Sequence, residues 1–548
     1  MRVVAFSITH DSSVCSIKDG KIEFFCKEER LSKVKRDKSP FLALEKLKSL
    51  NLGKIDRLMY HTPSNYNSDY FVWSEYTRKL FNVPLENFSF LTHHLCHASL
   101  ARFNSGFKKC LVIVVDRDGS LFFINDQPYA RETESVFECD ENWISPIYKN
   151  FSMLNNLKDE NNFTEKNIKE YFRDTEISVT SLGIVQVYEA ATTLIGEDVL
   201  ENGKTMGLSA YGKPINDKLF DDKGPIRNKF KIIDGKVNFY GSKNLEGLFS
   251  KNNYLYYAHV AKQVQKQTQE RVCDLIKKYV KKTGIKNVCI VGGYGLNVVA
   301  NSYYKTILPR VNFYFEPIAD DTGISIGAAM LKYKDTTNEK PVKNKSTFFH
   351  YYDKKDKCNL GKDSSFEEVS KLLQQQKSVA LFGGNPEAGP RALGHRSILF
   401  DARNPKAKDI VNQIKQREWY RPFAGVILEK YLSKFFKPIV KQSPNMTMNF
   451  QYISYQGDHL FPGILHVDNT SRLQTVGYKS SYISPLADIL EYFFQDTKCP
   501  VLLNTSFNLA GKPLVQTVED ALNVLKNSTL DAIYFMNEEK LVTKEDIK

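Results

Sequence analysis

Residues 2–20, RVVAFSITHDSSVCSIKDG, contain the pattern that decides the fold. The apolar run over residues 2–8 predicts a buried strand, and the polar segment Thr9–Ser13 predicts a turn. A hairpin follows with Asp19-Gly20 at its tip, a dipeptide that favours tight turns between antiparallel strands. The stretch therefore predicts a strand, a polar turn and a hairpin in succession.

The same pattern returns near residue 110. Residues 110–115, CLVIVV, predict a buried strand, and residues 116–120, DRDGS, predict an acidic turn. Two such units suggest the duplicated lobes of the actin/Hsp70-type (ASKHA) ATPase fold, which holds phosphates between two hairpins. A third strand leads into Gly292-Gly293, whose backbone amides can approach a phosphate or adenosine at a helix start. Paired glycines also mark ordinary strand–helix turns, so this signal is weak by itself.

Chain length and patterning indicate two α/β domains. With 548 residues and a mass of 62.9 kDa, the chain is too long for a single core. Residues 336–346, TTNEKPVKNKS, are polar, contain a proline and lack apolar periodicity, which predicts a linker. Helix-like and strand-like segments alternate after it. The expected domains are therefore residues 1–335 and residues 347–548.

Charge and cysteine usage narrow the partners and the compartment. A net charge of +13 favours anionic partners, but basic runs such as residues 27–38, KEERLSKVKRDK, contain acids and also fit a solvated face. No apolar run approaches the roughly 20 residues of a membrane-spanning helix, and the first residues lack the apolar core of a secretion signal. Nine cysteines without a CxxC pair argue against structural zinc and disulfides. We expect a cytoplasmic protein with no membrane partner.

Residues 92–101, THHLCHASLA, contain three of the ten histidines of the chain. On a helix, His93 and His97 are four residues apart and face the same way, as the two zinc ligands of HExxH do. The glutamate of that motif is absent here. The pair fits either a metal site or two hydrogen-bonded histidines, and a third ligand has to come from a distant part of the sequence.

The densest chemistry of the second domain begins with residues 383–401, GGNPEAGPRALGHRSILFD. Arginine forks match the geometry of phosphate and carboxylate, so several of them in one cleft would suit a nucleotide triphosphate or an acyl phosphate. In the alternative interpretation they pair with the acids Glu387, Asp401 and Glu418. The basic and polar residues concerned are Arg391, His395, Arg396, Lys415, Arg417, Arg421, His466, Arg472 and the segment Asn504–Asn508.

The order of motifs resembles that of O-carbamoyltransferases, the enzymes that carbamoylate hydroxyls of Nod factors, cephamycin, novobiocin and tobramycin. The blocks that carry the resemblance, in order, are HDSS, EERLSKVKRD, HHLCHA, ENGKTMGLSAYG, GGYGLN, DDTGISIGAA, EAGPRALGHRS, KQREWYRPFA, HVDNTSRLQTV and NTSFN. They extend from about residue 3 to about residue 520. The resemblance implies an N-terminal domain like the tRNA-threonylcarbamoylating ATPase and a C-terminal YrdC-like domain.

The resemblance also implies a metal site. It assigns two ligands to His93 and His97 and a third to Asp321, the aspartate of a DxG block, with Fe²⁺ as the expected divalent metal. Two imidazoles and a carboxylate leave coordination positions open for a ligand oxygen. Asp320 is the neighbour with which Asp321 could be confused. His94 points about 100° away from His93 on a helix and is expected to be a supporting or structural histidine.

The chemistry implied by the resemblance has two steps. Carbamoyl phosphate and ATP (with Mg²⁺) give carbamoyl adenylate in the C-terminal domain, and the carbamoyl group then moves to an acceptor hydroxyl at the N-terminal metal site. His10, beside Asp11, is the expected general base, and a histidine bonded within its own turn is the alternative. Residues expected to hold the mixed anhydride are Arg391, Arg396, Lys415, Arg421, Arg472 and Ser506. Residues matching nucleotide and phosphate blocks of the first domain are Lys35, Lys204, Gly292, Gly293 and Asn297.

One turn departs from the family pattern. After Asp116 the family usually has glycine in a DGxGE-like turn, whereas this chain has Arg117, and Ser120 stands where the family has an acid. We expect the turn to present a positive side chain, which would suit an anionic acceptor.

The acceptor itself is not identified by any motif. A small-molecule hydroxyl, as in a sugar or polyketide, is expected, and the alternative is a hydroxymethylated pyrimidine nucleotide or DNA that contains one. Steep loss of activity with salt would favour the polyanion. Alternatives from other functional classes are an ATPase or sugar kinase that transfers no carbamoyl group, and a nucleotide-sensing protein. A hydrogenase-maturation carbamoyltransferase would add acylphosphatase and cysteine-rich modules, which are absent. A homodimer is an open alternative for the assembly.

Overall fold

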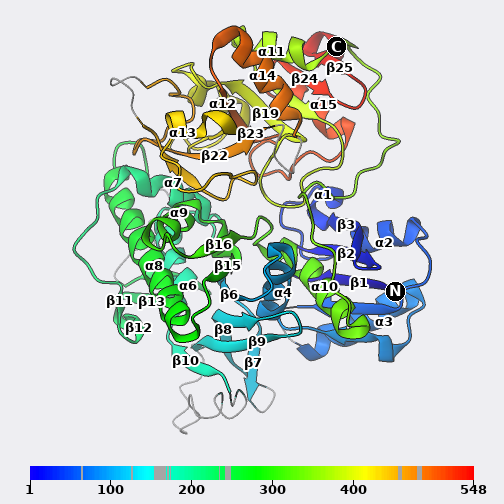
Figure 1. Cartoon of the computed structure of the whole chain (residues 1–548), viewed down its shortest axis with the longest axis vertical. Helices are drawn as coiled ribbons and strands as arrows, with labels where there is room; N and C mark the ends of the chain where they lie inside the picture. Colours follow the sequence, from blue (N-terminus) through cyan, green and yellow to red (C-terminus); the bar gives the residue numbers. More distant parts are fainter. Residues whose placement is uncertain are drawn as a thin grey trace. The chain divides into compact units, whose positions relative to one another are not determined.

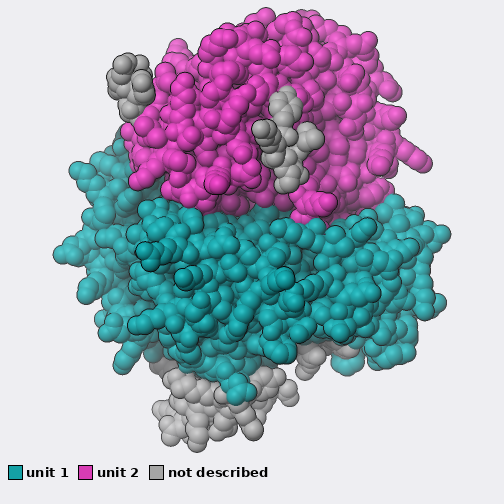
Figure 2. All heavy atoms as spheres, viewed as in Figure 1, with its two compact units in different colours: residues 1–23, 47–343 teal, residues 24–46, 344–548 magenta. Residues whose placement is uncertain are grey.

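The computed structural model describes residues 1–62, 66–124, 127–153, 168, 172, 174–233, 235–240, 249–453, 459–477 and 484–547. The chain forms two compact units (Figure 2). Unit 1 comprises Met1–Glu23 and Leu47–Lys343, and unit 2 comprises Phe24–Lys46 and Asn344–Lys548. The break after Lys343 falls inside the expected linker, whose first residues complete a helix.

Residues 24–46 are the exception to the expected division, because they group with unit 2 rather than with the first domain. The Phe25 ring packs edge-on against Phe349 and His350, with centroids 5.5 and 5.7 Å away. The Lys27 N–H donates to Nε2 of His350 at 3.0 Å, and Arg30 donates to the Glu387 carbonyl at 3.4 Å. This early segment is therefore held by side chains more than 300 residues further along.

Unit 1 contains two sheets with the same design (Figure 1). The first sheet has the order β3-β2-β1-β4-β5. Its strands are β1 (Arg2–Ser7), β2 (Ser13–Lys18), β3 (Lys21–Lys27), β4 (Arg57–His61) and β5 (Phe88–Phe90). β1 pairs antiparallel with β2 and parallel with β4. All six residues of β1 are buried, which explains its continuous apolar run.

The second sheet has the order β10-β9-β8-β6-β15-β16, with β7 added beside β8. Its strands are β6 (Cys110–Val115), β7 (Leu121–Ile124), β8 (Gln127–Cys139), β9 (Ile144–Met153), β10 (Glu176–Thr180), β15 (Asn287–Val291) and β16 (Asn312–Phe315). β6 pairs antiparallel with β8 and parallel with β15, as β1 does with β2 and β4. The repeat expected from residues 2–20 and 110–120 is confirmed by this common strand order.

Helices α4 (His93–Ser105) and α10 (Ile324–Thr337) pack against one another in unit 1 (Figure 1). The contact is very close at Gly327, where a Cβ atom would lie 1.9 Å from the Cys96 carbonyl oxygen. Gly323, just before α10, is equally crowded by the Leu100 side chain, 2.4 Å from a built Cβ. Two glycines therefore let the start of α10 approach the histidine-bearing helix.

The other elements of unit 1 cover the two sheets and form small hairpins. The helices are α3 (Tyr66–Phe81), α6 (Ile184–Leu194), α7 (Asn202–Leu208), α8 (Tyr254–Thr283) and α9 (Val298–Ile307), and α2 (Phe41–Ser49) crosses the boundary between the units. The short strands are β11 (Phe220–Asp221), β12 (Gly224–Pro225), β13 (Phe230–Ile233) and β14 (Lys236–Phe239). None of the helices built from the described residues is long and apolar enough to span a membrane.

Unit 2 is built on a mixed sheet of nine strands in the order β17-β25-β24-β18-β19-β23-β20-β22-β21. The strands are β17 (Lys362–Asp363), β18 (Val379–Phe382), β19 (Arg396–Asp401), β20 (Ala424–Leu428), β21 (Asn449–Gln451), β22 (Thr470–Val476), β23 (Val501–Ser506), β24 (Ala532–Phe535) and β25 (Lys540–Thr543). The helices are α1 (Glu28–Ser32), α11 (Phe366–Gln374), α12 (Ala407–Lys415), α13 (Leu432–Phe435), α14 (Pro485–Thr497) and α15 (Val518–Lys526). Both units are therefore α/β, as expected. All nine cysteines are free and buried, in agreement with the absence of disulfides.

Replacing Gly327 by alanine should destabilise unit 1, because the new methyl group would overlap the Cys96 carbonyl of α4. We expect Gly327→Ala to lower the free energy of unfolding by roughly 1–3 kcal/mol or more, as overpacked cores do. Gly203 of α7 is the matched control, because a Cβ there meets no atom within 4 Å. Gly203→Ala should leave stability unchanged or raise it. Urea unfolding midpoints test both, and equal effects of the two changes would contradict the close helix contact.

Candidate metal centre and cationic cluster

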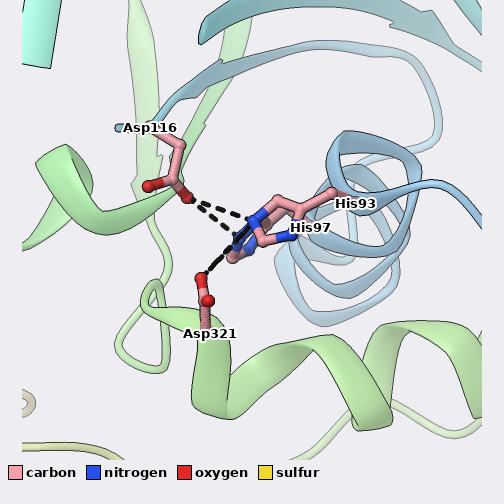
Figure 3. Close-up of side chains that lie close together, drawn as sticks. All are labelled: His93, His97, Asp116 and Asp321. Carbon is pink, nitrogen blue, oxygen red and sulfur yellow. Dashed lines mark hydrogen bonds and ion pairs between the residues drawn. The ribbon is translucent and has the colours of Figure 1, made fainter. Parts of the chain in front are cut away.

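Four side chains of unit 1 converge on one buried point (Figure 3). His93 and His97 lie on α4, Asp116 follows the end of β6, and Asp321 opens the short helical turn before α10. One ligand atom from each of the four lies within 4.8 Å of the others. The predicted ligands His93, His97 and Asp321 are thus brought together, and Asp116 joins them.

The distances between the four ligand atoms suit the binding of one metal ion by all four residues. The distance from His93 Nε2 is 3.5 Å to Asp116 Oδ2 and 3.4 Å to Asp321 Oδ1. From His97 Nε2 the corresponding distances are 3.1 and 3.7 Å, and the two Nε2 atoms are 3.2 Å apart. Ligands about 2.1 Å from one centre are separated by about 3.0 Å in an octahedron and about 3.4 Å in a tetrahedron. The donor set therefore fits a divalent metal.

The electrostatics of the cluster show that its buried carboxylates need a positive partner. Burial lowers the pKa of His93, but the charge of Asp321 and the hydrogen bonds that His93 donates to Asp116 and Asp321 raise it to about 10. Burial raises the carboxyl pKa values, but His93 and His97 more than offset this at Asp116, and His10, His93 and His97 do so at Asp321, so both pKa values lie below the usual range. Two buried carboxylates need positive charge beside them. That charge is either histidine protons or a metal.

His10 and Asp11 lie at the edge of this cluster, and the role of His10 as general base stays a prediction. His10 Nδ1 is 3.4 Å from Asp321 Oδ2, and its Nε2 is 3.3 Å from Asp11 Oδ2. The His10 side chain is 32% exposed, whereas that of Asp321 is 7% exposed. His10 is therefore more exposed than the cluster that it borders.

His94 faces away from the cluster. Its Nδ1 is hydrogen-bonded to the Ser135 hydroxyl at 2.7 Å, and burial lowers its pKa to about 3. A Cβ atom on Gly119 would lie 2.6 Å from His94 Nε2, so the ring also packs against the acidic turn. Its contacts are those of a structural histidine.

Asp116 was missed as a ligand because the sequence analysis treated its turn as a departure from the family. The available signal was its position directly after a buried strand, on the unit that repeats the β1 turn carrying Asp11. Its Oδ2 also accepts the Gly293 N–H at 3.3 Å. Gly292 has a φ of 87°, and a Cβ there would lie 2.4 Å from the Val115 carbonyl. The backbone of Gly292 and Gly293 therefore packs directly against the end of β6.

The departing residues of the turn have clear structural partners. Arg117 Nε donates to Glu189 Oε2 at 2.8 Å, and another of its nitrogens bonds to Asp118. The positive charge of Arg117 is therefore paired with two carboxylates, and an anionic acceptor at this turn stays a prediction. The Ser120 hydroxyl accepts the His93 N–H at 2.9 Å, so this serine fixes the first turn of α4.

Two residues predicted for nucleotide binding in unit 1 already have partners. Lys204 donates to Glu197 at 2.6 Å. Asn297 caps α9 by accepting the Ala300 N–H at 3.0 Å, and its amide donates to Gln265 at 2.9 Å. These contacts explain both residues structurally and leave nucleotide binding by them a prediction.

Unit 2 contains a cluster of cations that lower one another's pKa. Burial and then the charges of Arg417, Arg421 and Lys35 lower the pKa of Lys415 well below its ordinary value. Burial together with Arg391, Arg417 and Arg421 does the same to Arg472. The cationic cluster is Lys35, Arg391, Lys415, Arg417, Arg421 and Arg472. Lys415 is buried, the four arginines are half-buried and Lys35 is exposed. Like charges gathered in this way attract an anion with several negative charges.

Lys415 is held in the cluster by neutral groups. Its Nζ donates to the Ser506 hydroxyl at 3.0 Å and to Asn508 Oδ1 at 2.5 Å, and it also bonds to the Ser506 carbonyl. Of the predicted residues, Lys415 and Ser506 are therefore in direct contact, and the charge effects of Arg421 on Lys415 and of Arg391 on Arg472 are what group the three arginines with them. Lys35 joins them in unit 2, which corrects its expected place in the first domain.

The acids proposed as alternative partners are mostly engaged elsewhere. Asp401 pairs with Arg403 at 2.7 Å, and Glu387 accepts backbone N–H groups of Leu393 and His395 at 2.7 and 3.1 Å. Glu418 is the exception, because it lies 3.3 Å from Arg421.

Arg396, expected to be catalytic, is buried in the core of unit 2. Its guanidinium carbon lies 3.7 Å from the Phe382 ring centroid, and it donates to the carbonyls of Gly383 and Val515 at 2.8 and 3.2 Å. Burial lowers its pKa to about 10. These contacts hold the loop that precedes β19, and Arg396 does not join the cationic cluster.

The family of the chain is established by comparison with known proteins. Residues 65–330 match the carbamoyltransferase N-terminus family, and residues 370–544 match the carbamoyltransferase C-terminus family. The two matches together cover most of the sequence. The chain belongs to the carbamoyltransferase family and is a carbamoyltransferase.

Individual relatives are consistent with this assignment. Nodulation protein NolNO of Sinorhizobium fredii is 25% identical over 96% of this chain and 78% of its own length. Nodulation protein U of the same species is 34% identical over 42% of this chain and 41% of its own length. A crystal structure of full-length HypF in the phosphate- and nucleotide-bound form matches 61% of this chain and 56% of its own at 14% identity, with a TM-score of 0.38. That structural likeness is too low to support an argument.

The affinity of the cluster for a divalent metal should rise with pH. A metal ion displaces the proton from His93, whose pKa is raised to about 10, so protons compete less as the pH rises toward that value. We expect the apparent affinity for Co²⁺ to increase about tenfold per pH unit between about pH 6 and 8 for each proton displaced. Competition with a chelating indicator, corrected for the indicator's own protonation, measures it. An affinity that stays constant over this range would contradict the four-residue site.

Proposed function

We propose that this carbamoyltransferase is an ATP-dependent O-carbamoyltransferase that works at two separate sites. The supporting observation is that the two units carry sites of complementary chemistry: an imidazole–carboxylate cluster in unit 1 and a cationic cluster in unit 2. The first suits a metal and proton transfer. The second suits phosphate groups. In this proposal, unit 1 is an ASKHA-type domain, supported by its two sheets of common strand order, and unit 2 is YrdC-like.

The first reaction would take place in unit 2. Carbamoyl phosphate, ATP and water give carbamoyl adenylate, phosphate and pyrophosphate. Lys415 is buried and Arg472 is half-buried among like charges, so phosphate oxygens are the partners that best relieve their mutual repulsion. Ser506 and Asn508 hold the Lys415 ammonium group in place without neutralising it. Arginine forks at Arg391 and Arg421 would bind two oxygens at a time.

The second reaction would take place in unit 1. His93, His97, Asp116 and Asp321 would hold a divalent metal, with Fe²⁺ the choice that the resemblance implies. Such a metal, when bound, supplies a Lewis acid for a phosphate oxygen of the adenylate. The acceptor oxygen would attack the carbamoyl carbon of the adenylate, and AMP would leave as the bond from that carbon to the phosphate oxygen breaks. His10 would accept the hydroxyl proton, since it is partly exposed and lies 3.4 Å from Asp321. Asp11, 3.3 Å away, would stabilise the resulting imidazolium.

We propose a hydroxyl of a small molecule as the acceptor. The pairing of Arg117 with Glu189 and Asp118 removes the local positive charge that would have favoured a polyanionic acceptor such as DNA. Transfer activity that does not change with ionic strength is the expectation for a neutral acceptor.

The two reactions should be separable by mutation. Arg472→Ala should reduce carbamoyl-phosphate-dependent ATP–pyrophosphate exchange on the order of 100-fold, because a positive charge that would stabilise the phosphates is lost. Synthetic carbamoyl adenylate should restore transfer in this variant. His97→Ala and His10→Ala should keep exchange and lose transfer even with the adenylate supplied, and His97→Ala should also lose bound metal. Labelled pyrophosphate and labelled carbamoyl phosphate report the two steps.

Lys430→Ala is the matched control for loss of one positive charge in unit 2. Lys430 forms an exposed pair with Glu491 at 2.8 Å, and this change should alter neither step. Loss of exchange in folded His97→Ala to the extent seen in Arg472→Ala would contradict the two-site proposal and indicate one shared site.

A further inference from the structure

His61 is a fully buried histidine that lies beside the candidate metal centre without contributing to the group of four. It is the last residue of β4, opposite Ser7 of β1. Its ring stacks on Phe90, with centroids 5.8 Å apart, and meets the His93 ring edge-on at 5.0 Å. No motif in the sequence singled it out.

Two hydrogen bonds fix the protons of this histidine. His61 Nδ1 is 2.9 Å from the Leu91 carbonyl oxygen, and its Nε2 is 3.0 Å from His93 Nδ1. A carbonyl oxygen only accepts, so Nδ1 of His61 carries a proton and donates it. A buried neutral imidazole has one ring proton, so its Nε2 has a free lone pair. That lone pair accepts the Nδ1–H of His93.

The hydrogen bond from His93 to His61 also determines which nitrogen of His93 faces the candidate metal centre. With its proton held on Nδ1, His93 presents Nε2 toward Asp116 and Asp321, at 3.5 and 3.4 Å. We propose that His61 is a positioning residue that fixes the tautomer and the ring orientation of His93 and thereby prepares Nε2 for metal binding. This inference rests on the proposed metal centre.

The two histidines of the centre are supported unequally. The Nδ1 of His97 is buried and makes no hydrogen bond to any residue that the structure describes. His93 has the bond to His61, and its main-chain N–H is held by Ser120. The orientation of the His93 ring is therefore set by specific partners. Hydrogen-bond partners of metal-binding histidines raise metal affinity roughly 10–100-fold.

His61→Phe and His61→Gln test the role. Phenylalanine keeps a planar ring but removes the acceptor for His93, so we expect Co²⁺ affinity to fall about 10–100-fold. Glutamine can place an amide oxygen near the position of Nε2 and should restore part of the affinity. The visible spectrum of the Co²⁺ protein should change in the Phe variant, because one imidazole is no longer held in place. Unchanged affinity and spectrum in His61→Phe would overturn the proposal.

His350→Phe is the matched control, because His350 has the same hydrogen-bond pattern in unit 2. Its Nδ1 is 2.9 Å from the Tyr351 carbonyl, and its Nε2 accepts the Lys27 N–H at 3.0 Å. Loss of this buried histidine should lower stability as His61→Phe does but leave Co²⁺ affinity as in wild type. A similar loss of affinity in both variants would show that His61 acts only through general stability and would overturn the proposal.

Nitrogen-15 NMR of the histidine rings tests the tautomer in the unaltered protein. In the metal-free protein, His61 should carry its proton on Nδ1, and in the Zn²⁺-loaded protein His93 should bind through Nε2 with Nδ1 protonated. A proton on Nε2 of His61, or metal binding through Nδ1 of His93, would overturn the inference. Wild-type protein that binds no metal would instead contradict the proposed centre, while the metal-free spectrum would still decide the proton position on His61.

Discussion

Two carboxylates buried beside two imidazoles create the constraint on which the chemistry of unit 1 depends. The ligand atoms of Asp116, Asp321 and the two histidines all lie within 4.8 Å of one another. Buried carboxylate charges are unfavourable unless a positive charge compensates them. Histidine protonation can supply the compensation, because each Nε2 atom lies 3.1–3.7 Å from the carboxylate oxygens. A divalent cation would satisfy all four groups at once, and this is the basis of the proposed metal centre.

The fold explains how these groups come together from distant parts of the sequence. Asp116 lies at the end of the central strand β6, and His10 and Asp11 follow the equivalent strand β1 of the other sheet. The histidines and Asp321 are contributed by α4 and by the turn before α10, which approach closely because Gly323 and Gly327 have no side chain. The repeated strand order thus supplies the turns after β1 and β6. The two glycines allow α4 and the start of α10 to bring the histidines and Asp321 beside Asp116.

The sequence was informative where chemistry depends on local spacing. His93 and His97 could be paired from an i,i+4 pattern, and the repeated strand and turn predicted the two sheets. Asp321 required the family resemblance, because nothing local connects it to residues more than 200 positions earlier. Asp116 was missed because its turn differs from the family, and Lys35 was assigned to the wrong unit because the segment 24–46 packs on residues far along the chain. Arg396 lies in the segment 383–401 that was predicted to bind phosphates, yet cation–π and carbonyl contacts keep it in the core.

The central claim is that His93, His97, Asp116 and Asp321 bind one divalent metal. X-ray absorption of the protein loaded anaerobically with Fe²⁺ measures this directly, because imidazole rings give a characteristic multiple-scattering pattern. The account predicts one iron per chain with two imidazole ligands at about 2.1 Å and oxygen ligands in the remaining positions. Iron that binds without the imidazole pattern, or the absence of stoichiometric iron in correctly folded protein, would contradict it.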